Sequence, residues 1–436
     1  MTTVILGGGL TGLTVARLLH ERGEDVTVLE KEETIGGLCR SRTQDGFTFD
    51  TGGSHIIFSR DAEVLSFMQD VLEENKDIRE RNTKIFYKGQ FVKYPFENGL
   101  ADLSAEDRFF CLNEYITTLL ALERGDLKEP ENFKEWIYYT FGRGIAESYM
   151  VPYNEKIWNY PTENMSLHWV DGRIPRPPVE DIIRSACGIE TEGYTHQSIF
   201  TYPIAGGIEA MIHAIAKPIR SFIHTGTAVV SLRKKEDQWE VTLADGSVVL
   251  ADHCISTIPL QHLLPCLESV PETIRAACNA LKYNSIICVG VGLSKELPSY
   301  SWLYVPEKEL GAFNRISFPS NFSVTTSPDG CSSVLLEITC NKGDELYNLS
   351  DTDVTDHVIE GLIRMGFISG KEEVVTTTVS REEFAYVVYD LAYQKNIKTV
   401  REYCESQNID LLGRFSEFEY LNMDGIIRHV FDYLNA

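Results

Sequence analysis

A glycine-rich turn near the start of the chain constrains the fold more than any other feature. A short β-prone run at residues 3–6 leads directly into Gly7-x-Gly9-x-x-Gly12, and a helical stretch follows to about residue 21. The next β-prone run covers residues 26–30, so the segment predicts a βαβ unit. In such a unit the first glycine permits a tight turn, the second lets a pyrophosphate approach the backbone, and the third lets helix and strand pack closely. Because the helix N-terminus also offers unpaired N–H groups, the pattern predicts a dinucleotide site.

An acidic residue at the end of the second strand narrows the kind of dinucleotide. Glu30 lies 18 positions after Gly12. At this place a carboxylate accepts hydrogen bonds from the hydroxyl groups of an adenosine ribose. A carboxylate repels a 2′-phosphate, so the sequence favours an unphosphorylated adenosine at this site.

Four further segments stand out: residues 30–40 (EKEETIGGLCR), 50–53 (DTGG), 202–207 (YPIAGG) and 256–259 (STIP). They resemble the signatures of a large FAD-dependent family that includes amine oxidases, protoporphyrinogen oxidase, phytoene desaturases and UDP-galactopyranose mutase. The resemblance implies FAD as the cofactor. The FAD contacts that it implies come from Gly7, Gly9, Leu10, Thr11, Gly12, Glu30, Lys31, Gly37, Leu38, Arg40, Gly53, Ser54, Val229, Thr257, Arg414, Asn422, Met423 and Asp424.

The middle and the end of the chain contain five more specific segments: residues 94–98 (YPFEN), 142–158 (GRGIAESYMVPYNEKIW), 302–306 (WLYVP), 315–323 (RISFPSNFS) and 414–420 (RFSEFEY). They resemble UDP-galactopyranose mutase of the eukaryotic type. The resemblance covers roughly residues 3–430. The substrate contacts that it implies come from Tyr94, Glu97, Tyr149, Asn154, Trp158, Trp302, Tyr304, Asn321, Tyr386 and Tyr420.

The same resemblance implies catalytic roles for two arginines and a histidine. Arg173, four positions after Trp169, and Arg315 are expected to stabilise the departing diphosphate of a nucleotide sugar. Arginine suits this task because its guanidinium offers paired donors and keeps its charge. His55 is expected beside the flavin. The implied reaction is a redox-neutral pyranose–furanose interconversion, such as formation of galactofuranose, through an adduct between the sugar and N5 of the reduced flavin. The sequence leaves open whether NADPH or NADH reduces the flavin.

Two departures from the mutase pattern keep alternatives open. Glu97 stands where these mutases carry a glutamine that reads the uracil edge, and Arg60 stands where they carry a second histidine. An ionised carboxylate accepts hydrogen bonds but donates none, so it suits the amino groups of cytosine or guanine better than uracil. The alternatives are therefore a mutase that acts on a CDP- or GDP-sugar, and an FAD-dependent oxidoreductase similar to amine oxidases or protoporphyrinogen oxidase.

The predicted fold is α/β, with three interwoven parts. A Rossmann-like FAD-binding domain is expected from residues 1–65, 196–262 and 405–436, and an antiparallel-sheet substrate domain from residues 66–100 and 263–404. A mainly helical insert that binds the nucleotide is expected at residues 101–195. Within it, residues 104–124 predict one amphipathic helix with Ser104 as its cap, Phe109, Leu112, Ile116 and Leu119 on its apolar face, and Gly125 at its end.

Composition excludes several classes of partner. The 40 basic and 64 acidic residues give a net charge of −24, which disfavours nucleic acids and anionic membranes. The 10 cysteines form no Cys-x-x-Cys pair, so no metal site is expected and the thiols are expected to be free and buried. No apolar run reaches the roughly 18 residues of a spanning helix, and no leader pattern precedes the first strand. We therefore expect a cytoplasmic protein with a nucleotide-sugar substrate, and whether it forms a homo-oligomer stays open.

Overall fold

The computed structural model confirms the βαβ unit at the start of the chain. It describes residues 2–170, 173–174, 176–191, 198–236 and 238–435. Helix α1 (Leu10–Glu21) begins directly after the glycine turn and joins two strands that pair in parallel. These strands belong to a five-stranded parallel sheet with the order β19 (Asp410–Leu411), β13 (His253–Ser256), β1 (Thr2–Leu6), β2 (Asp25–Leu29) and β9 (Ile223–His224). The sheet is the predicted Rossmann-like core, and it gathers strands from both ends and the middle of the chain.

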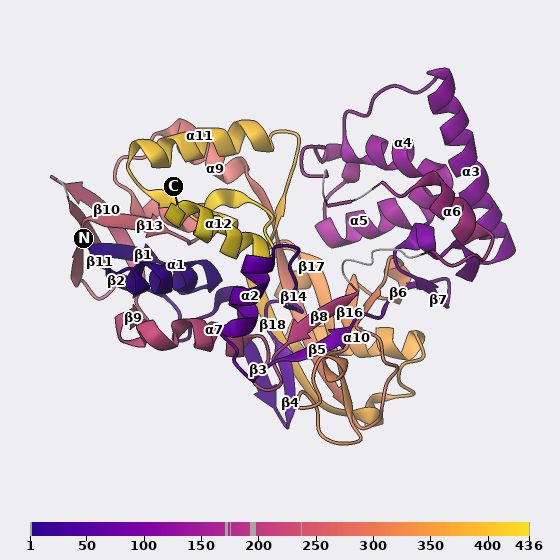
Figure 1. Cartoon of the computed structure of the whole chain (residues 1–436), viewed down its shortest axis with the longest axis horizontal. Coiled ribbons are helices and arrows are strands. Elements are labelled where there is room, and N and C mark those ends of the chain that lie inside the picture. The colour runs from indigo at the N-terminus through magenta and orange to yellow at the C-terminus, as the bar shows by residue number, and fades with distance from the viewer. Residues whose placement is uncertain (1, 171–172, 175, 192–197, 237, 436) are drawn as a thin grey trace.

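A larger, mixed sheet forms the second part of the molecule (Figure 1). All its neighbouring strands pair antiparallel except β15 and β6, which pair in parallel. Helix α10 (Asp351–Arg364) lies beside it and buries Val354 and Val358. The seven strands, in order, are β18 (Val374–Val388), β14 (Lys282–Leu293), β17 (Ser332–Cys340), β16 (Arg315–Ser317), β15 (Trp302–Tyr304), β6 (Thr83–Tyr87) and β7 (Gln90–Lys93).

Three small sheets complete the strands. An Asp-Gly pair is typical of a hairpin turn, and strands β11 and β12 pair antiparallel on either side of Asp245 and Gly246. The three-stranded sheet consists of β10 (Val229–Lys235), β11 (Gln238–Leu243) and β12 (Val248–Ala251), and the two-stranded ones of β3 (Ser41–Gln44) with β4 (Phe47–Asp50) and of β5 (Asp77–Glu80) with β8 (Ile199–Tyr202).

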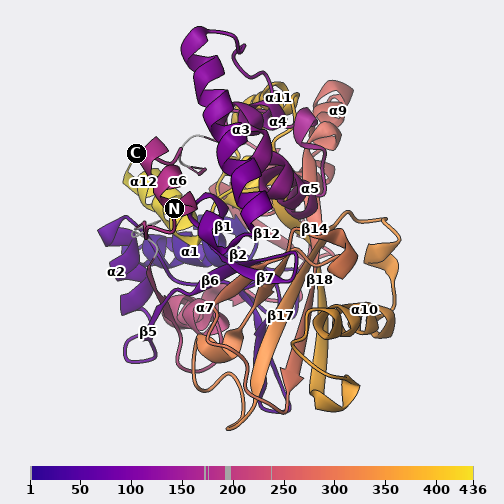
Figure 2. The ribbon, with the colours of Figure 1, turned by 90° about the vertical axis from the view of Figure 1, so that its right-hand side faces the viewer.

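The predicted helical insert is confirmed as a bundle at one end of the molecule (Figures 1 and 2). Its helices are α3 (Ala105–Arg124), α4 (Phe133–Ile145), α5 (Val151–Trp158) and α6 (Val179–Ala186). Helix α3 begins and ends as predicted: the Ser104 hydroxyl accepts a hydrogen bond from the Asp107 N–H at 3.1 Å, and Gly125 ends the helix with a φ of +73°.

The predicted apolar face of α3 is half right. Leu112 and Leu119 are partly buried against the core, but Phe109 is 70% exposed and Ile116 is 40% exposed, whereas Cys111 and Tyr115 are buried. The reason is the close approach of α4: a Cβ on Gly144 would lie 2.5 Å from the Cα of Cys111, so only a glycine lets the two helices touch at this point. Periodicity shows that a helix is amphipathic, but contact with α4 selects the face that is buried.

The remaining helices flank the two large sheets. They are α2 (Ala62–Asp70), α7 (Glu209–Ala216), α8 (Leu260–Leu263), α9 (Glu272–Ala280), α11 (Tyr393–Ser406) and α12 (Met423–Asn435). In the described part of the chain, no helix is both long and apolar enough to cross a membrane. The cysteines are free, as expected, although Cys187 is exposed. The boundary drawn between residues 195 and 196 lies outside the described residues, and the division into domains stays a prediction.

Candidate active site

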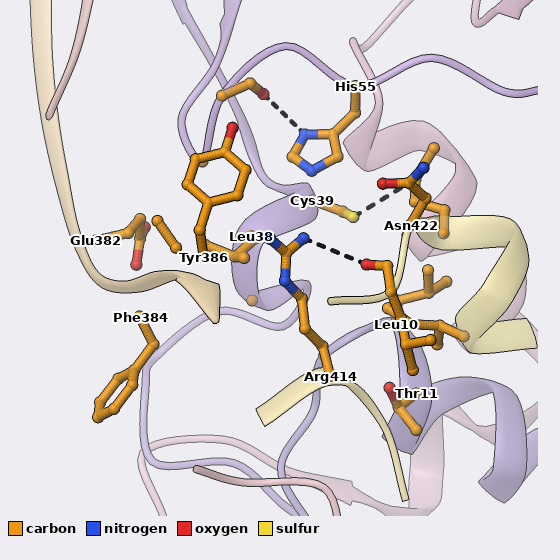
Figure 3. Close-up of a pocket in the computed structure, with 18 of the residues that line it drawn as sticks. Leu10, Thr11, Leu38, Cys39, His55, Glu382, Phe384, Tyr386, Arg414 and Asn422 are labelled. Atoms are coloured by element: carbon orange, nitrogen blue, oxygen red, sulfur yellow. Dashed lines mark hydrogen bonds between the residues drawn. The ribbon is translucent and has the colours of Figure 1, made fainter. Parts of the chain in front are cut away.

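A cavity of about 990 Å³ opens where the carboxyl ends of the parallel strands meet the seven-stranded sheet (Figure 3). Ligands of open α/β sheets bind at this end of the strands. The cavity is lined by segments that are far apart in sequence, namely residues 9–11, 31–40 in part, 52–61 in part, 382–386, 414–415 and 420–426. Several segments predicted to bind the cofactor therefore meet in one place.

The start of helix α1 faces this cavity without a side-chain cap. Gly9 is the N-cap residue and makes no capping hydrogen bond, so the first N–H groups of the helix are available to a ligand. Gly36 donates its N–H to the carbonyl of Gly8 at 2.8 Å and closes the loop over the turn. A Cβ on Gly12 would lie 2.0 Å from the carbonyl oxygen of Gly7, which explains the glycine there. The turn is built to receive an anionic group.

Glu30 is buried beside the glycine turn, outside the residues that line the cavity. One carboxylate oxygen accepts a hydrogen bond from the N–H of Gly8 at 2.6 Å, and the other accepts one from the N–H of Glu32 at 2.9 Å. Each oxygen keeps a further lone pair, which is what the hydroxyl groups of a ribose require.

Arg414 is a buried cation with unsatisfied donors in the cavity wall. Its Nη1 donates to the carbonyl of Leu421 at 3.3 Å, but Nε and Nη2 are buried without a partner. Burial lowers the pKa of the guanidinium, which means that the charge is poorly solvated. A buried donor without an acceptor is costly, so a bound group with acceptor oxygens fits this position. Together with the uncapped helix and Glu30, this residue makes the site fit FAD.

Arg173 and Arg414 lie over the same aromatic ring, that of Tyr420. The centre of each guanidinium lies 4.4 Å (Arg173) or 4.7 Å (Arg414) from the ring centroid. Arg173 also donates to the Tyr420 carbonyl, and Arg414 lies over Tyr386 at 5.2 Å. Within the described residues, neither arginine forms an ion pair with a carboxylate. Two such cations close together attract an anion such as a diphosphate.

Arg315, the other arginine predicted to bind the diphosphate, already has a partner. It lies directly opposite Glu337 in the register of β16 and β17, and Nε and Nη2 donate to the Glu337 carboxylate at 2.9 and 2.7 Å. Glu337 is 1% exposed and also accepts the Ser54 N–H at 3.1 Å. The charge of Arg315 is therefore balanced, although its side chain lines the cavity.

His55 points into the cavity between Tyr386 and Asn422 (Figure 3). Burial lowers the pKa of its imidazole to about 4, and Arg414 and Arg315 act in the same direction. The ring is thus neutral at physiological pH. Because Nδ1 lies 2.7 Å from the carbonyl oxygen of Gly53, Nδ1 carries the proton and Nε2 keeps a free lone pair.

The residues predicted to bind the nucleotide form an aromatic cluster next to the cavity. Tyr149 stacks on Phe96 at 5.0 Å and on Tyr153 at 5.1 Å. Tyr94 lies 5.1 Å from the ring of Tyr304, which lines the cavity. The cluster therefore adjoins the cavity through shared aromatic side chains.

Asn154 and Trp158 extend this cluster toward Tyr420. The Asn154 amide donates to the carbonyl of Met150 at 2.7 Å and accepts the Trp158 indole N–H at 3.2 Å, so its hydrogen bonds are used within the protein. The ring of Trp158 lies 5.5 Å from that of Tyr420. Trp158 is thus buried and packs against Tyr420, the ring over which the two arginines lie.

Glu97 is the acid buried in this cluster, at 4% exposure. Burial raises the pKa of its carboxyl to about 7, and the bond that opposes this shift comes from its own backbone N–H. Near neutral pH the carboxyl is therefore protonated in a large fraction of molecules. A protonated carboxyl both donates and accepts hydrogen bonds, as a glutamine amide does.

The structure brings many, but not all, of the predicted residues to the cavity. Those that line it are Gly9, Leu10, Thr11, Lys31, Gly37, Leu38, Arg40, Gly53, Ser54, His55, Thr257, Trp302, Tyr304, Arg315, Tyr386, Arg414, Tyr420, Asn422, Met423 and Asp424. The other predicted residues do not line it: Gly7 and Gly12 belong to the glycine turn beside the cavity and Glu30 lies next to that turn, Tyr94, Glu97, Tyr149, Asn154 and Trp158 belong to the adjoining aromatic cluster, and Arg173 contacts Tyr420. Val229, which begins strand β10, and Asn321, whose amide donates to the carbonyls of Pro298 and Tyr300, belong to neither group.

Sequence reasoning assigned no role to two acids of this region, Glu337 and Glu382. Glu337 is the lone charge in the run of residues 332–340, all of which are buried, and a lone acid in a buried strand signals a buried partner. Glu382 accepts a hydrogen bond from Arg40 at 2.8 Å, beside an irregular stretch of β18 that places Phe384 at the cavity wall (Figure 3). No pattern in the sequence marks this irregularity.

The chain belongs to the family of flavin-containing amine oxidoreductases, whose sequence profile matches residues 10–396. Membership of this family implies a flavin cofactor, in agreement with the residues that fit FAD. Among solved structures, that of a reduced UDP-galactopyranose mutase is similar over 100% of this chain and 93% of the other, with 27% identity and a TM-score of 0.91. The structure of a putative protoporphyrinogen oxidase from Exiguobacterium sp. 255-15 is similar over 100% of this chain and 98% of the other, with 18% identity and a TM-score of 0.77, and shows the same fold.

Sequence matches to curated proteins are short. UDP-galactopyranose mutase from Mycoplasma pneumoniae is 31% identical over 74 residues, which is 16% of this chain and 18% of that protein. A 4,4′-diapophytoene desaturase from Staphylococcus haemolyticus is 44% identical over 57 residues, 13% of this chain and 11% of the desaturase. These matches support the family, and they leave the reaction to be argued from the site.

Proposed function

We propose that this protein is a flavin-dependent nucleotide-sugar mutase that interconverts pyranose and furanose forms of the sugar, similar to UDP-galactopyranose mutase. The observation that carries the proposal is Arg173, an exposed cation that lies over the ring of Tyr420 and has no carboxylate partner within the described residues. A cation at this position suits the diphosphate of a nucleotide sugar and repels a cationic amine. The similarity to a reduced mutase over the whole chain supports the same conclusion.

The residues that would hold FAD are those of the fit described above. The N-terminus of α1 would face the pyrophosphate, Glu30 the ribose, and Arg414 an acceptor oxygen of the cofactor. When bound in its reduced form, the flavin supplies a nucleophile for the anomeric carbon of the sugar. The protein itself supplies orientation, charge and exclusion of water.

Arg173 is the residue that we assign to the diphosphate of the substrate. It is exposed beside Tyr420, so an entering diphosphate reaches it without breaking an ion pair. As the bond between sugar and diphosphate breaks, negative charge grows on the diphosphate, and a guanidinium in place stabilises it. By analogy with loss of one oxyanion donor, removal of Arg173 should cost about 3 kcal/mol of transition-state stabilisation.

Arg315 would act differently from Arg173. Because the Glu337 carboxylate binds two of its nitrogens, Arg315 is fixed in one orientation. Its remaining N–H groups can donate hydrogen bonds, but its charge is already balanced by Glu337. Tyr386 and Tyr420 adjoin the same place, and their hydroxyl groups are candidate donors to the diphosphate. The substrate would thus be held by one free cation, one balanced cation and phenol groups.

The substrate nucleotide is proposed to be uridine diphosphate. The buried Glu97 carboxyl, protonated near neutral pH, offers a donor and an acceptor side by side. The uracil edge presents an N–H and a carbonyl in the complementary order. The CDP- and GDP-sugar alternatives require the ionised form of Glu97, which burial disfavours.

Product analysis under anaerobic conditions tests the proposal. The purified protein is incubated with UDP-, CDP- and GDP-pyranoses, once with dithionite-reduced flavin and once with oxidised flavin, and the products are separated by chromatography. A new nucleotide sugar of unchanged mass, formed only with reduced flavin, is expected from the UDP-sugar. A product from the CDP- or GDP-sugar alone would show that the nucleotide of the substrate is not uridine diphosphate. No isomer, combined with oxygen consumption on an amine or porphyrinogen, would overturn the mutase in favour of an oxidoreductase.

A further inference from the structure

The carboxylate of Asp50 collects four hydrogen bonds from three separate segments. Oδ1 accepts from the Ser41 hydroxyl at 2.8 Å, the Tyr202 hydroxyl at 3.0 Å and the Ile208 N–H at 3.2 Å. Oδ2 accepts from the His55 N–H at 3.3 Å. The side chain is 3% exposed and has no ion-pair partner within the described residues. A buried carboxylate held by neutral donors alone is costly to maintain, so its retention calls for a role.

These bonds explain two motifs that lie more than 150 positions apart. Asp50 begins the segment Asp50-Thr51-Gly52-Gly53, and Ile208 directly follows Gly206-Gly207. A Cβ on Gly207 would lie 2.2 Å from the Ser41 hydroxyl and 3.2 Å from Asp50 Oδ1, and its φ is +63°. The second glycine is therefore required so that the start of helix α7 can approach the carboxylate.

Two of the three segments that Asp50 holds lead to the cavity. Ser41 follows Arg40, which lines it, and the segment 53–55 forms part of its wall. His55 receives two fixed points: its backbone N–H is bound by Asp50, and its ring Nδ1 by the carbonyl of Gly53. Because the backbone and the ring are both held, the lone pair of Nε2 is directed into the cavity.

We propose that Asp50 is a positioning residue for His55, and that its charge fixes the segment 53–55 so that the neutral imidazole faces the flavin with Nε2. The assignment rests on the proposed function only in that His55 lies beside the flavin. Asp50 itself is far too enclosed to touch a ligand.

The charged and titratable groups around this pair are few. Tyr202 from β8, Cys39 from the turn after Gly37, and His55 itself surround Asp50, while Arg414 and Arg315 face His55 from the other side. Burial raises the pKa of Asp50 to about 6, and the four hydrogen bonds oppose this rise. Acidification through this range neutralises Asp50 while His55 is still neutral, so the two titrations are separate.

The variant Asp50→Asn distinguishes a role in positioning His55 from a general role in stabilising the fold. The amide oxygen takes the place of Oδ1 and keeps its three donors, because turning the amide would cost three bonds. The amide NH₂ then replaces Oδ2 and faces the His55 N–H, so donor meets donor. The fold is retained and the hold on His55 is lost. The matched control is Ser41→Ala, which removes one donor from Oδ1 and leaves the bond to His55.

The experiment records the imidazole ¹⁵N signals of His55 in uniformly labelled protein, with His55→Gln to assign them, and measures FAD affinity in parallel. The wild type and S41A should show Nδ1 protonated and Nε2 unprotonated. D50N should show averaged tautomers and bind FAD about tenfold more weakly, the loss of one hydrogen bond to a charged group. Unchanged His55 signals in a folded D50N would overturn the proposal.

The wild type provides a second test that needs no variant. As pH falls toward 5, the His55 signals should shift with the protonation of Asp50, before His55 itself takes up a proton. A single transition at the lower pH of His55 alone would contradict the proposal. Because neither readout uses turnover, the absence of mutase activity would refute the proposed function and leave this test intact.

Discussion

Replacing Glu97 by glutamine tests directly whether the aromatic cluster encloses a carboxyl with a strongly raised pKa. The ordinary pKa of this side chain is 4.5, and burial raises it to about 7 in the folded protein. Glutamine has nearly the same shape and offers the same donor and acceptor, but it does not titrate. E97Q should therefore fold, keep the contacts of the neutral acid and lose its pH dependence.

The magnitude follows from linkage. Because the folded pKa exceeds the unfolded one, the folded state binds more protons between pH 4.5 and pH 7, so the free energy of unfolding falls as pH rises through this window. At about 1.36 kcal/mol for each unit, the whole effect is about 3 kcal/mol. About 2 kcal/mol of it falls between pH 5.5 and pH 8. E97Q should gain this amount relative to the wild type over that interval.

Urea unfolding of both proteins at pH 5.5 and pH 8 measures the difference, and both values avoid the pI of about 4.9. Glu123→Gln, on the exposed face of α3, is the matched control and should show no such gain. At pH 6 the infrared carbonyl band of protonated carboxylic acids should be weaker in E97Q than in the wild type, and the band of Asp50, whose pKa is about 6, should remain in both. Parallel stability curves for E97Q and the wild type would show that Glu97 is ionised throughout, and the argument for uridine would fail with it.

Three further perturbations have outcomes that the structure defines. Arg315→Ala leaves the carboxylate of Glu337 buried without its cation and should cost about 3–5 kcal/mol of stability in denaturant unfolding, and adding Glu337→Gln should recover a large part. Gly207→Ala forces a Cβ against the Ser41 hydroxyl at a positive φ, so thermal unfolding should occur at lower temperature and FAD should be retained less well. Burial lowers the pKa of Lys156 to about 7, so this side chain binds fewer protons in the folded state, and its contribution to the free energy of unfolding rises with pH. At pH 7 the free energy of unfolding of Lys156→Met should exceed that of the wild type, and the difference should shrink toward pH 10.

The local elements could be predicted from the sequence because their signals are local. The glycine turn, the cap at Ser104 and the hairpin at Asp245 each depend on residues that are neighbours in the chain. The family signatures could be read for the same reason, since each is a short segment. The order of strands β19, β13 and β1 brings these segments to one cavity, and no single segment of the sequence indicates this order.

The parts that sequence did not reveal depend on partners far along the chain. The ion pair between Arg315 and Glu337 exists because β16 and β17 pair in a register that sets the two residues opposite each other. The exposed side of α3 follows from the glycines through which α4 approaches it. The sequence also does not reveal that the charge of Arg414 is unpaired within the described residues, because this depends on which side chains the fold places around it.

This last point decides how an acidic protein can bind an anionic substrate. The net charge of −24 raises the electrostatic energy of a nucleoside diphosphate near the surface, although salt screens this over about 8 Å at physiological ionic strength. Binding must therefore come from cations within direct reach of the phosphates, and these cations must not already be neutralised. Arg315 and Arg40 are paired with Glu337 and Glu382. Within the described residues Arg173 forms no such ion pair, and its exposed guanidinium over the ring of Tyr420 is open to an entering diphosphate.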